Sequence, residues 1–196
     1  MVRKKTRERL QLTEEIKESA KILKKGGIVV FPTDTVYGMG CKFDDKKAVG
    51  QIRKIKGTPK SQKMPVLIDN KKYLEKLGCK VTPKARNLIK KFWPGALTLI
   101  FNSDYGRIGL RMPNHPATLA LIKEAGFPII GTSANFHGRP APTSFEELDK
   151  KFLAKVDFVL KGECILKKES TVIDVTAIHP RVLRLGAIKL DLNYEQ

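Results

Sequence analysis

The fold of this chain is constrained most strongly by the alternation of short apolar runs with amphipathic segments of helical period. The run at 28–31 is rich in β-branched residues and is bounded by glycine and proline, so it predicts a buried strand rather than a helix. Strands are expected there and at 64–68, 96–101, 108–112, 128–131, 156–160, 171–175 and 182–185.

Helices are expected in several of the intervals between these strands, because the apolar residues there fall on one helical face. The residues expected to start them are Thr13, Asp44 or Asp45, Asn70, Thr82 with Pro83, Pro116, and Ser144 in capping-box spacing with Glu147. Some strands follow one another without a helix between them, which favours a mixed sheet over a purely parallel one. The predicted fold class is a single α/β domain with a twisted mixed parallel/antiparallel sheet and flanking helices.

The length of 196 residues, with 41% hydrophobic residues, is typical of one domain with a substantial core. Residues 1–12 are expected to form a basic N-terminal tail, and residues 13–190 the domain. The N-terminus lacks the apolar stretch of a signal peptide, and no window approaches ~18 uninterrupted apolar residues. We therefore expect a soluble, cytoplasmic protein without a membrane partner. Cys41, Cys79 and Cys164 form no CxxC pair and are expected to be reduced, structural thiols.

The chain is strongly basic, with 38 Lys and Arg residues against 20 Asp and Glu and a formal net charge of +18. The segment 42–91 alone contains 16 Lys and Arg residues against four acidic ones. A clustered positive field attracts polyanions, so nucleotides, RNA or acidic partners are expected ligands. A Lys-rich surface without a specific partner is the alternative. Aromatic residues are sparse in this segment, which gives little support for a base-stacking platform.

The common nucleotide and zinc motifs are absent, since the sequence contains no Walker A loop, no GxGxxG after a strand and no HExxH. His115, His137 and His179 stand beside proline or glycine, which favours solvated or helix-capping histidines.

Polar residues follow the apolar run at 128–130, in the sequence GTSAN at 131–135 and its continuation to Thr143. Because ligands gather at strand ends in α/β sheets, this loop is interpreted as an anion cradle of hydroxyl and backbone N–H groups. Two alternatives remain open: an ordinary polar turn, and a hydrolase with Ser133 as nucleophile. The hydrolase needs a G-x-S-x-G turn, and Asn135 occupies the last glycine position.

A second polar cluster, PTDTVYG at 32–38, also follows a predicted buried strand and either binds a small polar ligand or closes a turn. Lys56 is interpreted as a phosphate ligand or as a solvated lysine. Arg111 interrupts an apolar strand, where a charge is costly unless paired, so a fixed anion such as a carboxylate is expected beside it. Arg184 interrupts its apolar run in the same way.

Seven motifs occur in order: GGIVVFPTDTVYG, IKGTP, FWPGALT, IGLRMPNHP, PIIGTSANFHGRPAPT, ESTVIDVT and VLRLGAI. Together, from about Ile16 to Ile188, they closely resemble the YrdC-domain family, the L-threonylcarbamoyl-AMP synthases of tRNA modification. The resemblance implies a YrdC-like fold with a concave basic cleft. It also implies condensation of ATP, L-threonine and bicarbonate or CO2 to threonylcarbamoyl-AMP and pyrophosphate, after which a partner transferase carries the threonylcarbamoyl group to tRNA.

The resemblance also implies roles for individual residues. Thr35, Arg111 and Ser170 would bind L-threonine, with the Arg111 guanidinium on its carboxylate. Lys56, Ser133, Asn135 and Arg184 would bind the ATP phosphates, and Lys56, Ser133 and Asn135 would also act in catalysis. Such chemistry depends on positioning and electrostatics rather than on a covalent nucleophile. Mg²⁺ would enter with ATP, held by the phosphates rather than by a carboxylate cage.

The sequence departs from the family pattern at several positions. Thr58 replaces a phosphate-binding arginine, for which Arg53, Lys60 or Lys63 are candidate substitutes. The other departures are Leu67 for a histidine, Arg107 for a small hydroxyl residue and Ala141 for a serine. These changes favour, as the alternative function, a non-catalytic YrdC-like protein that binds nucleotide or RNA directly.

Overall fold

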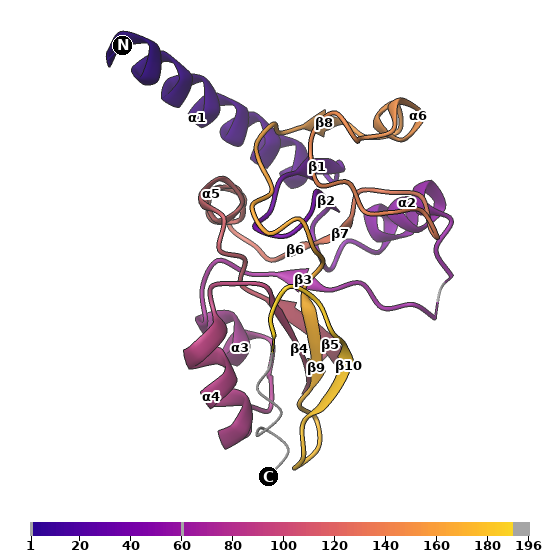
Figure 1. Ribbon diagram of the computed structural model, residues 1–196. Coiled ribbons are helices and arrows are strands. Elements are labelled where there is room, and N and C mark those ends of the chain that lie inside the picture. The colour runs from indigo at the N-terminus through magenta and orange to yellow at the C-terminus, as the bar shows by residue number, and fades with distance from the viewer. Residues whose placement is uncertain (1, 60, 190–196) are drawn as a thin grey trace.

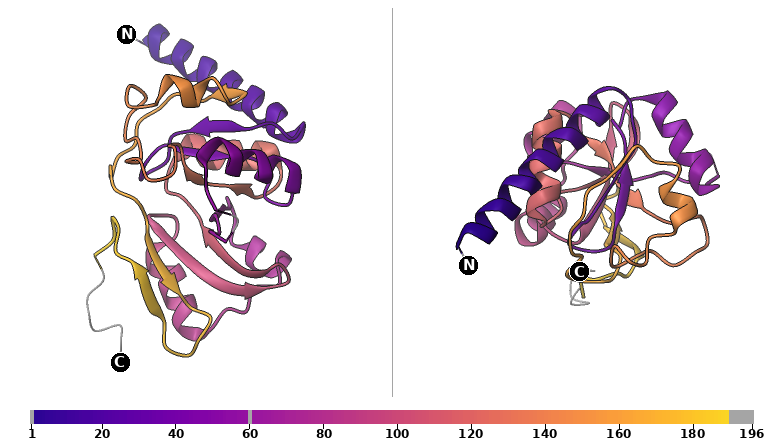
Figure 2. Two further views of the ribbon diagram at one scale, coloured as in Figure 1. Left: turned by 90° about the vertical axis from the view of Figure 1, so that its right-hand side faces the viewer. Right: turned by 90° about the horizontal axis from the view of Figure 1, so that it is seen from above.

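The computed structural model describes residues 2–59 and 61–189 and, within them, arranges the strands in two sheets. The four-stranded sheet has the order β7 (Thr132–Ser133), β2 (Gly38–Gly40), β1 (Val29–Phe31), β8 (Phe158–Val159). The six-stranded sheet has the order β10 (Arg181–Arg184), β9 (Thr171–Asp174), β4 (Leu97–Ser103), β5 (Gly106–Arg111), β3 (Val66–Leu67), β6 (Ile129–Ile130). The two sheets lie one above the other (Figures 1 and 2).

Both sheets are mixed, which confirms the predicted fold class. β1 pairs antiparallel with β2 and parallel with β8, and β4 pairs antiparallel with β5 and parallel with β9. The prediction of one sheet is wrong, because the chain crosses from β6 in one sheet to β7 in the other at Gly131. A Cβ atom there would lie 2.3 Å from Cγ of the buried Leu67 side chain, so a larger residue at this position would force Leu67 to move.

The helices are α1 (Val2–Lys24), α2 (Lys46–Lys56), α3 (Lys72–Lys76), α4 (Pro83–Phe92), α5 (Pro116–Ala125) and α6 (Lys150–Leu153). Several predicted caps are confirmed. The Asp45 carboxylate accepts from two backbone N–H groups of α2, and the Thr82 hydroxyl accepts from Ala85 N at 3.2 Å. His115 is the N-cap of α5, in line with the capping role expected of a histidine.

The helix start predicted at Thr13 is wrong. The helix begins at Val2, and the Thr13 hydroxyl donates to Arg9 O at 2.9 Å inside it. The preceding residues include three Arg, two Lys, two Leu and one Glu, and no glycine or proline, so their helix propensity continues α1 across this position. The boundary between 1–12 and 13–190 therefore stays a prediction, and residues 1 and 190 lie outside the described residues.

The helix start predicted at Ser144 is also wrong. The Glu147 carboxylate does fold back, but it accepts from Thr143 N at 2.7 Å, and the chain there forms turns. The Asp149 carboxylate instead caps α6 by accepting from Lys151 N at 2.7 Å. The polar side chains at 143–147 therefore stabilise a turn rather than the start of a helix. A turn and a helix N-terminus use the same kind of hydrogen bond, from a backbone N–H group to a nearby side-chain oxygen.

The helices pack against the two sheets and against one another. α1 packs on α5 through Ala20 and Leu23, and α3 and α4 lie against one face of the six-stranded sheet (Figure 1). Cys41, Cys79 and Cys164 are free thiols, and burial raises the pKa of Cys41 to about 12. No helix within the described residues is both long and apolar enough to span a membrane.

Candidate active site

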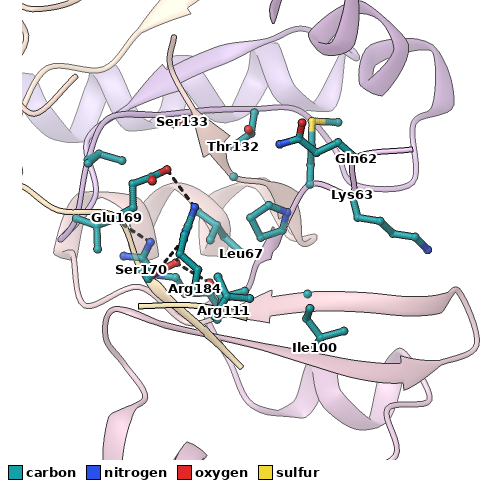
Figure 3. A pocket seen from close by; sticks show the side chains of 18 of the residues that line it. Gln62, Lys63, Leu67, Ile100, Arg111, Thr132, Ser133, Glu169, Ser170 and Arg184 are labelled. Atoms are coloured by element: carbon teal, nitrogen blue, oxygen red, sulfur yellow. Dashed lines mark hydrogen bonds and ion pairs between the residues drawn. The ribbon is translucent and has the colours of Figure 1, made fainter. Parts of the chain in front are cut away.

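A cavity of about 550 Å³ lies between the two sheets. Its floor includes Thr98, Ile100 and Gly109 from the six-stranded sheet, and its other wall includes Thr132 and Ser133 from β7. The side chains at its two ends differ (Figure 3). The group that we call the Arg111 end comprises Thr35, Arg111, Ser170 and Arg184. The group that we call the Lys63 end comprises Gln62, Lys63, Ile100 and Arg107.

Arg111, the last residue of β5, is buried and forms an ion pair with Asp34. Its guanidinium also donates to Thr35 Oγ1 at 2.9 Å and to Gly95 O at 3.1 Å. Burial lowers the pKa of Arg111, and the charge of Asp34 opposes this shift. The sequence predicted a fixed carboxylate beside this arginine, and Asp34, from the PTDTVYG segment, confirms it.

Ser170 is buried immediately before β9, with its hydroxyl 2.9 Å from Thr98 Oγ1. Arg184 donates to Ser170 Oγ at 3.2 Å and to Ser170 O at 3.0 Å, and it pairs with Glu169 at 3.2 Å. The sequence predicted an anion beside Arg184, as beside Arg111, and Glu169 confirms it. The surroundings differ, because every residue of β10 is exposed and Arg184 avoids the desolvation cost that applies to Arg111.

Lys56 lies at the C-terminal end of α2 and is 6% exposed. Its ammonium donates to Ser133 O, to Asn135 O at 2.7 Å and to Asn135 Oδ1 at 3.2 Å. Burial lowers the pKa of Lys56 to about 8, and the charge of Glu169 opposes the shift. Lys56 therefore holds the loop that carries Ser133 into the cavity.

The structure brings five of the seven expected site residues to one cavity. These are Thr35, Arg111, Ser133, Ser170 and Arg184. Lys56 and Asn135 bind each other behind the Ser133 loop and are not among the residues that line the cavity. Ser133 lies in β7 and is followed by an irregular loop, so it lacks the strand-turn-helix geometry that the hydrolase alternative requires.

Thr58 stands where the family has an arginine, and the residues that could replace this arginine differ in their positions and contacts. Thr58 is buried, and its hydroxyl has no hydrogen-bond partner among the described residues. Arg53 donates to Pro59 O at 2.7 Å and to Gln62 O at 2.9 Å, so its guanidinium holds the loop. Lys60 lies outside the described residues. Lys63 lines the cavity, and its ammonium donates to Arg107 O at 3.1 Å.

Sequence reasoning did not assign roles to Glu169 or Asp174, the carboxylates that pair with Arg184 and Arg107. The only signal for Glu169 was its place before Ser170. Asp174 gave none, because its pairing with Arg107 depends on the neighbouring strands β4 and β5.

Residues 21–186 match the Sua5/YciO/YrdC domain family, which is described as "Telomere recombination". The chain is similar to the threonylcarbamoyl-AMP synthase of Bacillus subtilis (strain 168), with 38% identity over 189 residues that cover 89% of this chain and 54% of the relative. The chain spans about half the length of this synthase and of that from Pyrococcus abyssi.

Two solved structures are similar to the whole fold. A crystal structure of P. abyssi Sua5 complexed with L-threonine shares 35% identity with a TM-score of 0.85, over 89% of this chain and 54% of that one. The crystal structure of E. coli YciO shares 28% identity with a TM-score of 0.81, over 94% of both chains.

Proposed function

The chain belongs to the Sua5/YciO/YrdC domain family, and we propose that it is an L-threonylcarbamoyl-AMP synthase. The observation that carries the proposal is the gathering of Thr35, Arg111, Ser133, Ser170 and Arg184 around one cavity. These residues come from motifs far apart in the sequence, and they supply hydroxyl and guanidinium groups suited to an amino acid and a nucleotide.

L-threonine is assigned to the Arg111 end. A guanidinium has five N–H groups, of which three bind Asp34, Thr35 and Gly95. Two N–H groups remain for the carboxylate of the amino acid. The hydroxyl groups of Thr35 and Ser170 lie at the same end and are assigned to the polar groups of the substrate.

ATP is assigned to the space beside Ser133, with Arg184 at the α-phosphate, next to the threonine at the Arg111 end. Lys56 and Asn135 act through the loop, since both contact it from behind. The amine of threonine attacks CO2 and loses a proton, or attacks bicarbonate with loss of water, to form a carbamate. A carbamate oxygen then attacks the α-phosphorus. The bond between the α-phosphorus and its bridging oxygen breaks, and pyrophosphate leaves with the electron pair. Ser133 and Arg184 stabilise the charge on the phosphoryl oxygens.

Mg²⁺ is proposed to enter as part of the nucleotide substrate, bound by phosphate oxygens. Among the described residues no group of three or more His, Cys, Asp or Glu side chains is placed to hold a metal ion. A partner transferase is proposed to move the threonylcarbamoyl group to tRNA. The net charge of +18 supports contact with polyanions such as tRNA, and the proposed place of this pathway is the cytoplasm.

The test is incubation of the purified protein with ATP, L-threonine, bicarbonate and Mg²⁺. We expect pyrophosphate and threonylcarbamoyl-AMP in amounts that depend on all three substrates. Omission of each substrate in turn is the control, because an ATPase contaminant releases phosphate without threonine. Absence of product under these conditions contradicts the synthase function.

The alternative is a non-catalytic protein that binds nucleotide or RNA, and one observation favours it: Thr58 stands where the family has a phosphate-binding arginine, and it carries no charge. RNA held by several phosphate contacts dissociates steeply with salt, whereas threonine in a cavity responds little. Tight, salt-sensitive RNA binding without product formation would therefore favour the alternative.

A further inference from the structure

The charged groups around the cavity are mostly paired. Arg107 pairs with Asp174, Arg111 with Asp34, and Arg184 with Glu169. Lys63 also lines the cavity, but it forms no ion pair with any residue in 2–59 or 61–189. Because each arginine is balanced by a carboxylate, the uncompensated positive charge of the lining lies at Lys63.

The position of Lys63 is supported by neighbouring contacts. The Arg53 guanidinium donates hydrogen bonds to the carbonyl groups of Pro59 and Gln62. These bonds hold the chain just before Lys63. The Lys63 ammonium donates to the backbone carbonyl of Arg107 at 3.1 Å, and Arg107, on β5, lines the same cavity. Figure 3 shows Gln62 and Lys63 at the opposite end of the cavity from Glu169 and Ser170. The ammonium thus stands at a distinct end of the site.

We propose that the Lys63 end is a pyrophosphate subsite, in which Lys63 binds the β- and γ-phosphates of the nucleotide and then the pyrophosphate released. The identity of the nucleotide rests on the proposed function. A lysine ammonium is a compact charge on a flexible stem and suits a multiply charged, mobile group better than a planar carboxylate. As the bond to the α-phosphorus breaks, the leaving oxygen gains negative charge, which Lys63 stabilises.

Arg107 provides a second cation for the same group. Its side chain is 53% exposed in the pair with Asp174, and exposed ion pairs contribute little free energy. A ligand with several negative charges therefore competes well for this guanidinium. Arg111 at the other end is 8% exposed in its pair and stays with Asp34.

The experiment is calorimetric titration with inorganic pyrophosphate, which requires no turnover. The variants are Lys63→Ala, Lys63→Arg and the matched control Lys54→Ala, which removes an equal charge from an exposed position of α2 outside the cavity. We expect Lys63→Ala to weaken pyrophosphate binding about tenfold or more, and Lys63→Arg to change it less than about threefold. Lys54→Ala is expected to leave it unchanged.

Titrations with ATP, AMP and L-threonine assign the group that Lys63 contacts. Lys63→Ala should weaken the binding of ATP, which has β- and γ-phosphates, and leave the binding of AMP and of L-threonine unchanged. Equal weakening by Lys63→Ala and Lys54→Ala, loss of threonine affinity, or no pyrophosphate binding by the wild type would each overturn the proposal. The wild type could bind pyrophosphate and lose this binding in Lys63→Ala, yet make no threonylcarbamoyl-AMP. That result would support the subsite and refute the synthase function.

Discussion

The two ends of the cavity contain the same kind of ion pair in different surroundings. At the Arg111 end the side chains of Arg111 and Asp34 are 8% and 5% exposed, whereas at the Lys63 end those of Arg107 and Asp174 are 53% and 11% exposed. A buried pair that loses one partner leaves an uncompensated charge, but an exposed charge is solvated by water. The first pair therefore fixes the geometry of the site, and the second remains available to a ligand.

The largest effect is expected from Asp34→Asn, which removes the charge that balances Arg111. The free energy of unfolding should fall by about 3–5 kcal/mol, as for other broken buried pairs. Urea denaturation of wild type and variant measures the change. A loss below about 1 kcal/mol would show that the Arg111 end behaves like an exposed pair, and the contrast between the two ends would be lost.

Arg111→Lys tests the same end through ligand binding. The variant keeps the positive charge but loses the planar fork, so affinity for L-threonine should fall by about 1.5–3 kcal/mol. Affinity for pyrophosphate should stay unchanged, because that ligand is assigned to the Lys63 end. Calorimetric titration with each ligand decides the matter, and unchanged threonine affinity in a folded variant would remove Arg111 from the threonine site.

Lys56, which contacts the Ser133 loop, should make the free energy of unfolding depend on pH. Its pKa is about 8 in the folded protein and near 10.4 in an unfolded chain, so the unfolded state binds more protons between these values. Stability from this group is therefore lowest below pH 8 and rises as the pH increases above it. The wild type should gain about 1 kcal/mol relative to Lys56→Met between pH 8 and pH 9.

Urea denaturation of both proteins at each pH measures this gain, and other titrating groups cancel in the difference. If the difference between wild type and Lys56→Met is independent of pH over this range, the ammonium keeps an ordinary pKa and is not desolvated.

The smallest effect is expected from Arg107→Gln. Its pair with Asp174 is largely exposed on the arginine side, so the free energy of unfolding should change by no more than about 1 kcal/mol. Threonine affinity should be unaltered. A loss comparable to that of Asp34→Asn would show that both ends depend on their ion pairs for folding.

Local sequence signals predicted much of the fold and the chemistry of the Arg111 end. The caps at Asp45 and Thr82 depend on backbone groups within three residues, so they are readable from the sequence. Arg111 places a charge within an apolar strand, which predicted a carboxylate beside it. The sequence did not indicate that its partner is Asp34, which is 77 residues away and reaches it only through the packing of the two sheets.

The Lys63 end was less predictable for a related reason. Lys63 was one of three candidate cations near position 58, and nothing local separates it from Arg53. Both side chains donate to backbone carbonyl groups, but Lys63 is among the residues that line the cavity and Arg53 is not. Only the tertiary structure shows this difference. Likewise, the division into two sheets depends on which strands pair, and hydrophobic periodicity along the sequence does not indicate the pairing partners.

The path of the chain between the sheets has a consequence for unfolding cooperativity. The chain passes from one sheet to the other between β2 and β3, between β6 and β7 at Gly131, and between β8 and β9. Neither sheet is therefore a continuous segment that could melt while the other persists. Differential scanning calorimetry should show a single transition with equal calorimetric and van't Hoff enthalpies, and a ligand bound between the sheets should move that whole transition to higher temperature.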